Sequence, residues 1–597
     1  NSNRKKAMKI RRLDIKNYRG IRELSWIVPE DHQLLMLVGP GDSTKSTIID
    51  ALYLALSERY SLSLSDTDFY LGNVDEPITI RVTLIELRAE VMKHNVLGME
   101  MGGIKEDGTL THDPGDGDKT CLTIQLSIDA DLEPVWSVYR EGGTEPFTQI
   151  GVGARKKLSV FKVDERIDGH LRWSRTSALG KLTESEHDTS GTLAAATRAS
   201  RAAVTKAISA ELQTLTDEVQ ARMNQLGSGN FKALRPGLDT SVPSSSGLLA
   251  LYEDQVPLMN YGLGTRRLAG LATQQLAHSG KSILMIDEVE YGLEPHRLVF
   301  LLSKLKGSED IAQAFITTHS PVAIEQMKAT DVFVVRSDGA GGVQVHSFAG
   351  TPRSAQAVLR SNPSALLARR VFFGEGRTEY GLLLGLMETW DRERVLLGDT
   401  PAVGLGTALA DGGGGSNAPV RARMLQGVGY ETYVVMDNDD RSVDKVVRKA
   451  QAAGVAVIRW ESEKATEDEL VDTLSAELLT DLLDIAVENR VNEATVLQDL
   501  NNKVSYGVVL ADLDVDTWIA DHELSLEECQ ALIAGAASEY SWFKNPDQGR
   551  NLANWVLDHE SDLDSSEFWA KIMEVKAAMY PQGPAGGDVE PESDVDG

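Results

Sequence analysis

An eight-residue stretch at positions 39–46, Gly-Pro-Gly-Asp-Ser-Thr-Lys-Ser, has the composition of a loop that binds nucleotide phosphates. In such loops, backbone N–H groups and the start of the next helix hold the phosphates, a lysine reaches the β- and γ-phosphates, and a hydroxyl binds Mg²⁺. Thr44 stands where glycine is usual and Asp42 adds negative charge, so we expect weak nucleotide binding or slow turnover. The predicted nucleotide-binding residues here are Gly39, Gly41, Lys45, Ser46 and Thr47.

Two later motifs could complete a site for ATP hydrolysis. The apolar run 282–286 is followed by Asp287, which would hold Mg²⁺, and by Glu288, which would polarise the attacking water. His319 follows another apolar run and could sense the γ-phosphate. A solvated strand end or a core histidine would explain either motif alone, but their order and spacing favour a nucleotide site.

A glycine-containing segment, 260–267, lies between these motifs and opens a predicted helix. A helix N-terminus beside cations attracts anions, and Arg266 and Arg267 are adjacent to it. We therefore expect Gly262 and Gly264 to contribute to nucleotide binding.

Acidic residues in the second half of the chain suggest a different chemistry. Glu375 follows an apolar run, Glu379 lies one helical turn later, and Asp437 and Asp439 follow another apolar run about sixty residues further on. The carboxyl ends of parallel strands meet at one edge of a sheet, so these carboxylates should converge. Such a cluster is unfavourable without a cation, and oxygen ligands suit Mg²⁺ or Mn²⁺. Ordinary acidic strand ends are the alternative.

The surrounding pattern predicts an α/β protein with two alternating regions. The alternation of charged and apolar residues at 9–16 and the apolar runs at 32–38, 282–286, 314–318 and 332–336 predict strands of the first region, and 47–57 predicts a helix. A second region has expected strands at 370–373, 432–436 and 455–459 and helices at 380–390 and 443–453. An apolar stripe over 204–226 predicts a helix that either packs on its own domain or mediates dimerisation.

Charge and composition restrict the function further. The net charge of −29 taken as a whole argues against a nucleic-acid binder, but residues 461–597 carry −25 of it and the first 460 residues only −4. With two cysteines, no disulfide framework or cysteine zinc site is expected, and no apolar run is long enough to span a membrane. These features predict a cytoplasmic protein.

Together, the motifs of the first region resemble those of the ABC-type ATPases of the repair group, such as RecF, SMC and Rad50-like proteins. In that group the glycine-rich segment completes the nucleotide site of the partner subunit, so the resemblance implies ATP held between two copies. The Gly-Glu-Gly at 374–376 followed by Asp-x-Asp at 437–439 resembles the Toprim domain of topoisomerases, primases and certain nucleases, although valine is more frequent at the position of Gly374.

An ABC-type ATPase joined to a C-terminal Toprim domain resembles the OLD (overcoming lysogenisation defect) family of ATP-dependent endonucleases, over about residues 9–554. The resemblance implies a homodimer or higher homo-oligomer and two-metal cleavage of DNA, with ATP and Mg²⁺ or Mn²⁺ as cofactors. It also implies a catalytic lysine, which Lys544 could supply, although a solvated surface lysine is the alternative. The implied metal ligands are Glu375, Glu379, Asp437, Asp439, Glu467 and Asp468, with Ser46 and Asp287 for the nucleotide's Mg²⁺.

The expected organisation is an α/β fold: an ABC-type ATPase with a helical dimerisation insertion, followed by a Rossmann-like Toprim domain with helical additions. The expected boundaries are 1–172 and 241–350 for the ATPase, 173–240 for the insertion, 351–368 for a linker, 369–578 for the Toprim domain and 579–597 for a disordered acidic tail. The predicted function is a DNA endonuclease in anti-phage defence, with or without a helicase-like or reverse-transcriptase partner. A DNA-binding ATPase clamp for recombinational repair, without cleavage, is the alternative; a Toprim primase or topoisomerase fits less well.

Overall fold

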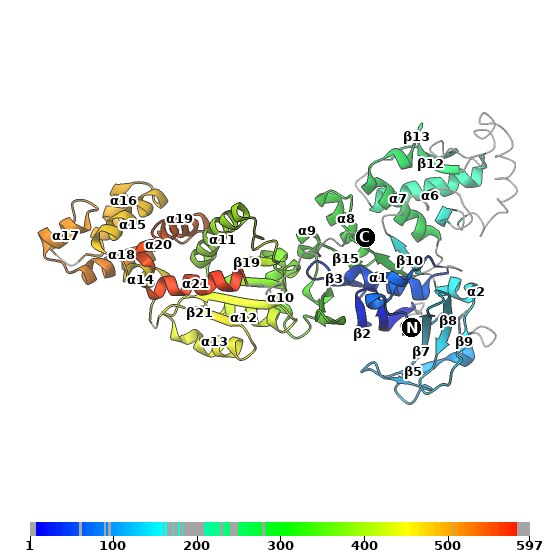
Figure 1. Ribbon diagram of the computed structural model, residues 1–597. Coiled ribbons are helices and arrows are strands. Elements are labelled where there is room, and N and C mark those ends of the chain that lie inside the picture. Colours follow the sequence, from blue (N-terminus) through cyan, green and yellow to red (C-terminus); the bar gives the residue numbers. More distant parts are fainter. Residues whose placement is uncertain are drawn as a thin grey trace, which may run out of the picture. The chain divides into compact units, whose positions relative to one another are not determined.

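The computed structural model describes residues 7–58, 62–88, 91–92, 97–158, 160–163, 171, 177–179, 182, 208–226, 231–238, 249–277, 281–461, 463–504 and 507–581. The chain forms two compact units, Asn1–Gly350 and Thr351–Gly597, each with its own sheet and hydrophobic core (Figure 1). Most of the predicted insertion 173–240, and nearly all of the predicted tail 579–597, lie outside the described residues.

The first unit is organised around one fourteen-stranded mixed sheet. Its strands, in spatial order, are β10 (Val160–Val163), β14 (Ser282–Ile286), β15 (Ile311–Thr317), β3 (Leu34–Val38), β16 (Val332–Ser337), β17 (Gly342–Ser347), β2 (Ile21–Ile27), β1 (Lys9–Tyr18), β4 (Ile78–Ile85), β7 (Lys119–Ile128), β5 (Gly102–Ile104) and β6 (Leu110–Thr111). In addition, β8 (Pro134–Tyr139) pairs with β7, and β9 (Thr148–Gln149) pairs with β8. The first five strands run parallel, so the carboxyl ends of β14, β15 and β3 share one edge. Every residue of these three strands is buried, which explains their continuous apolar sequences.

Helices and a small second sheet complete this unit. They are α1 (Lys45–Leu56), α2 (Val152–Arg155), α6 (Ala210–Leu226), α7 (Leu263–Ala277), α8 (Pro295–Leu305), α9 (Pro321–Glu325), the single turns η1 (Asp66–Asp68), η2 (Tyr70–Gly72), η3 (Gly98–Glu100), η4 (Lys156–Leu158), η6 (Leu258–Asn260) and η7 (Ala329–Asp331), and strands β11 (Leu234–Leu238), β12 (Leu249–Glu253) and β13 (Val256–Pro257). The apolar stripe of α6, including Leu215, Val219 and Met223, is buried where α6 contacts α7 and β11. The structure therefore agrees with the interpretation in which this helix packs within its own unit.

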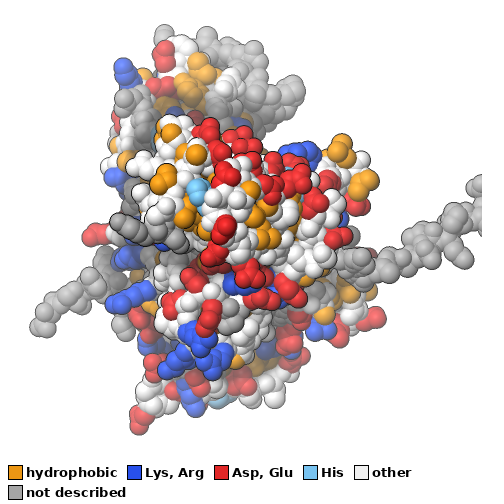
Figure 2. All heavy atoms as spheres, turned by 90° about the vertical axis from the view of Figure 1, so that its left-hand side faces the viewer, with side chains coloured by type: hydrophobic (Ala, Val, Ile, Leu, Met, Phe, Trp, Pro, Cys, Tyr) orange, Lys and Arg blue, Asp and Glu red, His pale blue; other side chains and the backbone are white. Residues whose placement is uncertain are grey.

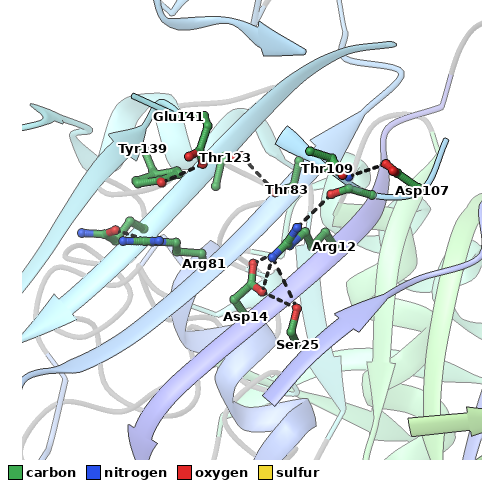
Figure 3. Close-up of polar contacts among 12 residues, drawn as sticks. Arg12, Asp14, Ser25, Arg81, Thr83, Asp107, Thr109, Thr123, Tyr139 and Glu141 are labelled. Atoms are coloured by element: carbon green, nitrogen blue, oxygen red, sulfur yellow. Dashed lines mark hydrogen bonds and ion pairs between the residues drawn. The ribbon is translucent and has the colours of Figure 1, made fainter. Parts of the chain in front are cut away.

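The antiparallel part of the large sheet has one apolar and one polar face. Side chains such as Leu13 and Val82 enter the core, whereas the opposite face carries a network of hydrogen bonds (Figure 3). There Arg12 pairs with Asp14 at 2.8 Å, and the hydroxyls of Thr83 and Thr123 lie 2.9 Å apart. This alternation with a period of two residues is the sequence signal of a strand.

The second unit contains a parallel four-stranded sheet in the order β19 (Thr407–Asp411), β18 (Arg370–Gly374), β20 (Glu431–Met436) and β21 (Ala456–Arg459). The helices α11 (Arg377–Leu397), α12 (Asn417–Gln426) and α13 (Asp444–Gln451), with the turn η9 (Arg441–Val443), connect these strands. Three of the strands lie where the sequence predicted them. The sequence analysis missed β19, a short strand that is followed directly by the glycines of 412–415.

Residues 351–368, expected to form a linker, instead form the helix α10 (Pro352–Ser361) and the turn η8 (Pro363–Leu367). Val358, Leu359 and Leu366 are buried, so this segment is part of the second unit. Its hydrophobic residues recur at helical spacing, which was the available sequence signal for a helix.

A layer of C-terminal helices covers part of the second unit. The helices are α14 (Thr466–Val471), α15 (Ala476–Asn489), α16 (Glu493–Asn501), α17 (Val515–His522), α18 (Leu526–Tyr540), α19 (Pro546–Asp558), α20 (Glu560–Leu563) and α21 (Glu567–Met579). Their inner sides carry large buried residues such as Trp518 and Trp555, and their outer sides are rich in Asp and Glu (Figure 2). Among the described residues, no helix has both the length and the apolar character that crossing a membrane requires.

Candidate functional site

The loop between β3 and α1 has a backbone conformation that constrains its residue types. Gly39 has φ = 145°, and a Cβ at this position would lie 2.6 Å from the carbonyl oxygen of Val335. Asp42 and Thr44 have φ values of 57° and 66°, in the left-handed region that non-glycine residues adopt at some cost. The loop therefore accepts Thr44 where glycine is usual, but the backbone at this position keeps the positive φ that favours glycine.

Lys45 is buried at the first position of α1 and points back into the loop. Its Nζ donates hydrogen bonds to the carbonyl oxygens of Gly39 and Pro40, at 3.0 and 2.7 Å, and to Ser43 Oγ at 3.0 Å. Burial lowers the pKa of Lys45 to about 8. A phosphate group in this loop would replace neutral acceptors with a charged one and so stabilise the ammonium form.

Ser46 and Asp287, which are 241 residues apart, meet between α1 and the end of β14. Ser46 Oγ donates to Asp287 Oδ1 at 2.9 Å, and Thr317 Oγ1 donates to the same oxygen at 2.6 Å. The hydroxyl of Thr317 in turn accepts the backbone N–H of Glu288 at 2.8 Å. A hydroxyl and a carboxylate held together in this way are the pair that Mg²⁺ of a bound nucleotide requires.

The remaining residues predicted for this site have different environments. Gly41 is exposed and Thr47 half-buried beside the loop, Glu288 has φ = 46° directly after Asp287, and His319 is exposed after the end of β15. All four therefore lie at the carboxyl edge of the parallel strands or in the loop that faces it. Sequence reasoning missed Glu290, whose carboxylate joins two of these loops.

The glycine-rich segment before α7 has a partly structural role that sequence reasoning did not anticipate. Gly262 is exposed, but Gly264 is buried, and a Cβ there would lie 2.2 Å from the carbonyl oxygen of Gly292. Arg267, expected to attract anions, is buried and donates to the carbonyl oxygens of Asp287, Glu288 and Tyr291 at 2.7–2.8 Å. Close packing explains Gly264, and support of the Asp287–Tyr291 loop explains Arg267.

A second site lies in the other unit, at the carboxyl edge of the four-stranded sheet. A solvent-open cavity of about 630 Å³ brings together acidic residues from β18, β19, β20, α11 and α14. Its lining side chains and backbone segments come from Glu375, Gly376, Arg377, Thr378, Glu379, Asp411, Gly413, Gly414, Asp437, Asp439, Ala465, Glu467, Ser538 and Lys544. The predicted convergence of Glu375, Glu379, Asp437 and Asp439 is thus observed.

Hydrogen bonds fix three of these carboxylates. Glu375 accepts the backbone N–H of Gly415 at 3.1 Å and that of Asp437 at 3.0 Å, and Glu379 accepts that of Gly376 at 2.8 Å. Asp437 Oδ1 accepts both the backbone N–H and the hydroxyl of Thr466, each at 2.9 Å. The carboxylates are therefore held in place by backbone donors and one hydroxyl.

The electrostatics of the cavity favour bound protons or cations. Burial, followed by the nearby Asp437, raises the pKa of Glu375 and of Glu467 to about 7. The pKa values of Asp437 and Glu379 are also raised, because both groups are buried and close to other carboxylates. In the described structure, Glu467 Oε1 is buried without a hydrogen-bond partner. An unsatisfied buried oxygen among acidic neighbours fits a hard divalent cation.

The carboxylates do not yet form a closed ligand set. Across the described residues, no three His, Cys, Asp or Glu side chains are gathered closely enough to hold a metal ion. A bound cation would have to draw the carboxylates closer together than they lie here.

Two residues predicted for this site have separate environments. Asp468 does not line the cavity; its Oδ2 accepts the N–H of Ala465 at 3.0 Å and caps α14. Lys544 lines the cavity, donates to the carbonyl oxygen of Ser538 at 2.9 Å, and lies near enough to Glu467 to oppose the rise in its pKa. The structure therefore separates Asp468 from the candidate ligands and brings Lys544 to them.

Sequence reasoning missed Asp411, at the end of β19, and Thr466, between two cavity residues. For Asp411 the sequence did offer a signal. An acidic residue at the end of a strand, followed by Gly412 and Gly413, matches the pattern around Glu375. No motif identified Thr466, whose role depends on tertiary contacts.

Comparison with known proteins finds a family match over the region that contains the first of the two sites. Residues 34–325, just under half of the chain, match the family described as "AAA domain, putative AbiEii toxin, Type IV TA system". This region is an ATP-binding ATPase domain, and it contains the loop at 39–46, Asp287, Glu288 and His319. No curated protein matches the chain.

Similar solved structures cover somewhat more than half of the chain. An Smc head bound to the C-terminal winged-helix domain of ScpA is 14% identical with a TM-score of 0.36, covering 57% of this chain and 98% of that one. An Smc head with an extended coiled coil, bound to the C-terminal domain of ScpA from Pyrococcus furiosus, is 13% identical with a TM-score of 0.38, covering 59% and 99%. The recombination mediator RecF with ATP is 12% identical with a TM-score of 0.37, covering 58% and 100%.

Proposed function

We propose that this chain is an ATP-hydrolysing, divalent-metal-dependent DNA endonuclease of the OLD type, in which an ABC-type ATPase is joined to a Toprim nuclease domain. The observation that carries the proposal is the cavity in which Glu375, Glu379, Asp437 and Glu467 meet at the carboxyl edge of a parallel sheet. The raised pKa values of Glu375 and Glu467 and the unpartnered oxygen of Glu467 support a cation there. The nearly neutral first 460 residues leave room for contacts with DNA phosphates.

In this proposal the protein's own groups bind and orient the reactants. The cation ligands are Glu375, Glu379, Asp437, Asp439 and Glu467. Bound divalent cations would supply activation of water and stabilisation of the leaving oxygen during phosphodiester hydrolysis. Thr466 fixes one oxygen of Asp437, and Lys544 offers a positive charge to the scissile phosphate. Glu379 and Glu467 are buried at the base of their helices, so burial favours neutralisation of their charge by a proton or a cation.

At the ATPase site, Lys45 would bind the β- and γ-phosphates, and Ser46 and Asp287 would hold Mg²⁺. Glu288 would polarise the attacking water and His319 would sense the γ-phosphate. The exposed Gly262, at the start of α7, would complete the nucleotide site of a second copy, so we propose a homodimer. Anti-phage defence in the cytoplasm, with or without a helicase-like or reverse-transcriptase partner, is the proposed context.

The test is cleavage of supercoiled plasmid with Mg²⁺ or Mn²⁺, with and without ATP. The wild-type protein should nick or linearise the plasmid, EDTA should stop the reaction, and Asp437→Ala should abolish it. The matched control is Asp484→Ala, which changes an exposed acidic residue of α15 in the same unit, outside the cavity. Activity that survives Asp437→Ala would contradict the assignment of the site.

A protein that binds DNA and hydrolyses ATP but leaves every plasmid intact with both metals would overturn the nuclease proposal. That result would favour the alternative, a DNA-binding ATPase clamp in recombinational repair. Binding should therefore be measured on the same plasmid by mobility shift, in Ca²⁺, before cleavage is scored.

A further inference from the structure

Glu290 lies in the loop that follows β14, three residues after Asp287. It is half-buried, and no step of the proposed ATP hydrolysis uses its carboxylate. The loop is already tied to the end of β15, because the N–H of Glu288 donates to Thr317 Oγ1 and the N–H of Val289 donates to the carbonyl oxygen of Thr317 at 3.0 Å. The backbone next to Glu290 is therefore held in place relative to β15.

Both carboxylate oxygens of Glu290 accept hydrogen bonds from the segment after β15. Oε2 accepts the hydroxyl of Thr318 at 2.6 Å, and Oε1 accepts the backbone N–H of His319, also at 2.6 Å. The hydroxyl of Thr318, which is fully buried, also accepts the N–H of Ser320 at 3.0 Å. Hydrogen bonds to an ionised carboxylate are stronger than neutral ones, so this bidentate contact should hold the 318–320 backbone firmly.

The arrangement links the two catalytic segments of the proposed ATPase. Asp287 and Glu288 lie at the beginning of the loop that carries Glu290, and His319 is the residue that Glu290 holds by its backbone. The His319 side chain is itself exposed, so its backbone is the part that the protein fixes. A small displacement of a catalytic group can lower a rate by as much as about 10²-fold.

From this geometry we propose that Glu290 is a positioning residue for ATP hydrolysis, which sets the place of His319 relative to Asp287 and Glu288. The inference rests on the proposed role of His319 as the sensor of the γ-phosphate. Both carboxylate oxygens of Glu290 are engaged by Thr318 and His319, so Glu290 acts through His319, and its loss should change the catalytic rate and leave the binding of ADP intact.

The experiment compares Glu290→Ala, Glu290→Gln, His319→Ala and the double variant in the full-length protein. The matched control is Glu294→Gln, which changes an exposed acidic residue of the same segment that pairs only with Arg297 among the described residues. We measure kcat and KM for ATP, and the affinity for ADP with N-methylanthraniloyl-ADP. Glu290→Gln keeps the shape of the side chain and one acceptor, so it tests the role even if Glu290→Ala folds poorly.

We expect Glu290→Ala to lower kcat by about 10- to 100-fold, with ADP affinity within about twofold of wild type, and Glu290→Gln to be intermediate. Because Glu290 acts through His319, the double variant should be no slower than His319→Ala alone. Losses that multiply in the double variant, or an unchanged kcat in Glu290→Ala while His319→Ala is impaired, would overturn the proposal. If His319→Ala itself is fully active, the sensor role of His319 is wrong, and the role of Glu290 fails with it.

Discussion

The nucleotide site and the carboxylate cavity both lie at the carboxyl edge of parallel strands, but their charges are balanced differently. In the nucleotide site, Lys45 is surrounded by carbonyl oxygens and Asp287 accepts two hydroxyls, so each charge has partners within the fold. In the cavity, six carboxylates share their lining with two cationic residues among those that the structure describes, Arg377 and Lys544. Hydrogen bonds orient side chains in both sites, but the cavity also contains a repulsion between carboxylates that protons or cations must relieve.

The largest expected effect is the loss of ATP hydrolysis, without loss of DNA cleavage, when Lys45 is replaced. Lys45→Ala removes the only side chain of the loop that can carry positive charge to the phosphates, so ATP hydrolysis should fall by at least about 10²-fold. Metal-dependent plasmid cleavage in the absence of ATP should persist, because Lys45 and the carboxylate cavity belong to different units. Phosphate release and plasmid nicking measured on one preparation would check this. Loss of ATP-independent cleavage in a folded Lys45→Ala protein would show that the sites do not act separately.

The second prediction is a pH dependence of stability that results from the repulsion between the carboxylates of the cavity. Glu467 has its pKa raised from 4.5 to about 7, so the folded protein binds more protons than the unfolded chain between these values. The free energy of unfolding of the second unit should therefore fall as pH rises from about 4.5 to about 7, by about 3 kcal/mol for this group. Added Mn²⁺ should remove much of that loss, because a cation stabilises the ionised form.

Urea unfolding in EDTA at several pH values, followed by tryptophan emission, measures this effect. Six of the nine tryptophans lie after residue 350, so the signal reports mainly the second unit. Glu467→Gln should flatten the pH dependence and weaken the stabilisation by Mn²⁺. An unchanged pH profile in Glu467→Gln would contradict the electrostatic account of the cavity.

The third prediction is that Gly262 and Gly264, which were both predicted to bind nucleotide, differ in their importance for stability. Gly264→Ala should destabilise the first unit by about 1–3 kcal/mol, because its Cβ would meet the carbonyl oxygen of Gly292 at 2.2 Å. Gly262→Ala adds a methyl group in open space and should leave the melting temperature within about a degree, since surface changes of this kind cost little. Thermal unfolding of both variants provides the comparison. Equal melting temperatures would show that the close approach of α7 to Gly292 is not important for stability.

The smallest expected effect concerns Asp468, which sequence reasoning counted among the metal ligands. Asp468→Asn should cost at most about 1 kcal/mol, through a weaker cap on α14. Its affinity for Mn²⁺, measured by titration calorimetry, should equal that of wild type, in contrast to Glu467→Gln. A loss of Mn²⁺ affinity in Asp468→Asn would return Asp468 to the ligand set.

The sequence predicted the parts of both sites that depend on local order along the chain. A buried run followed by acidic residues identified β14 with Asp287 and β20 with Asp437, and the loop at 39–46 was recognised from eight consecutive residues. It missed β19, because five residues of mixed polarity before a glycine run give little periodic signal. It also assigned a linker to the residues of α10, because this short helix offers only three buried residues, Ala355, Val358 and Leu359, as a periodic signal.

The amino-acid sequence by itself determined which residue types stand at the ends of the strands, because strand periodicity and the adjacent acidic, hydroxyl and glycine residues are local features. Only the tertiary structure decided which of these groups meet. Ser46 reaches Asp287 because β3, β15 and β14 are neighbours in one sheet, and Glu467 faces the cavity while Asp468 turns to cap α14. The physical reason is that contacts, burial and the resulting pKa values depend on long-range packing, which brings together residues that no local pattern connects.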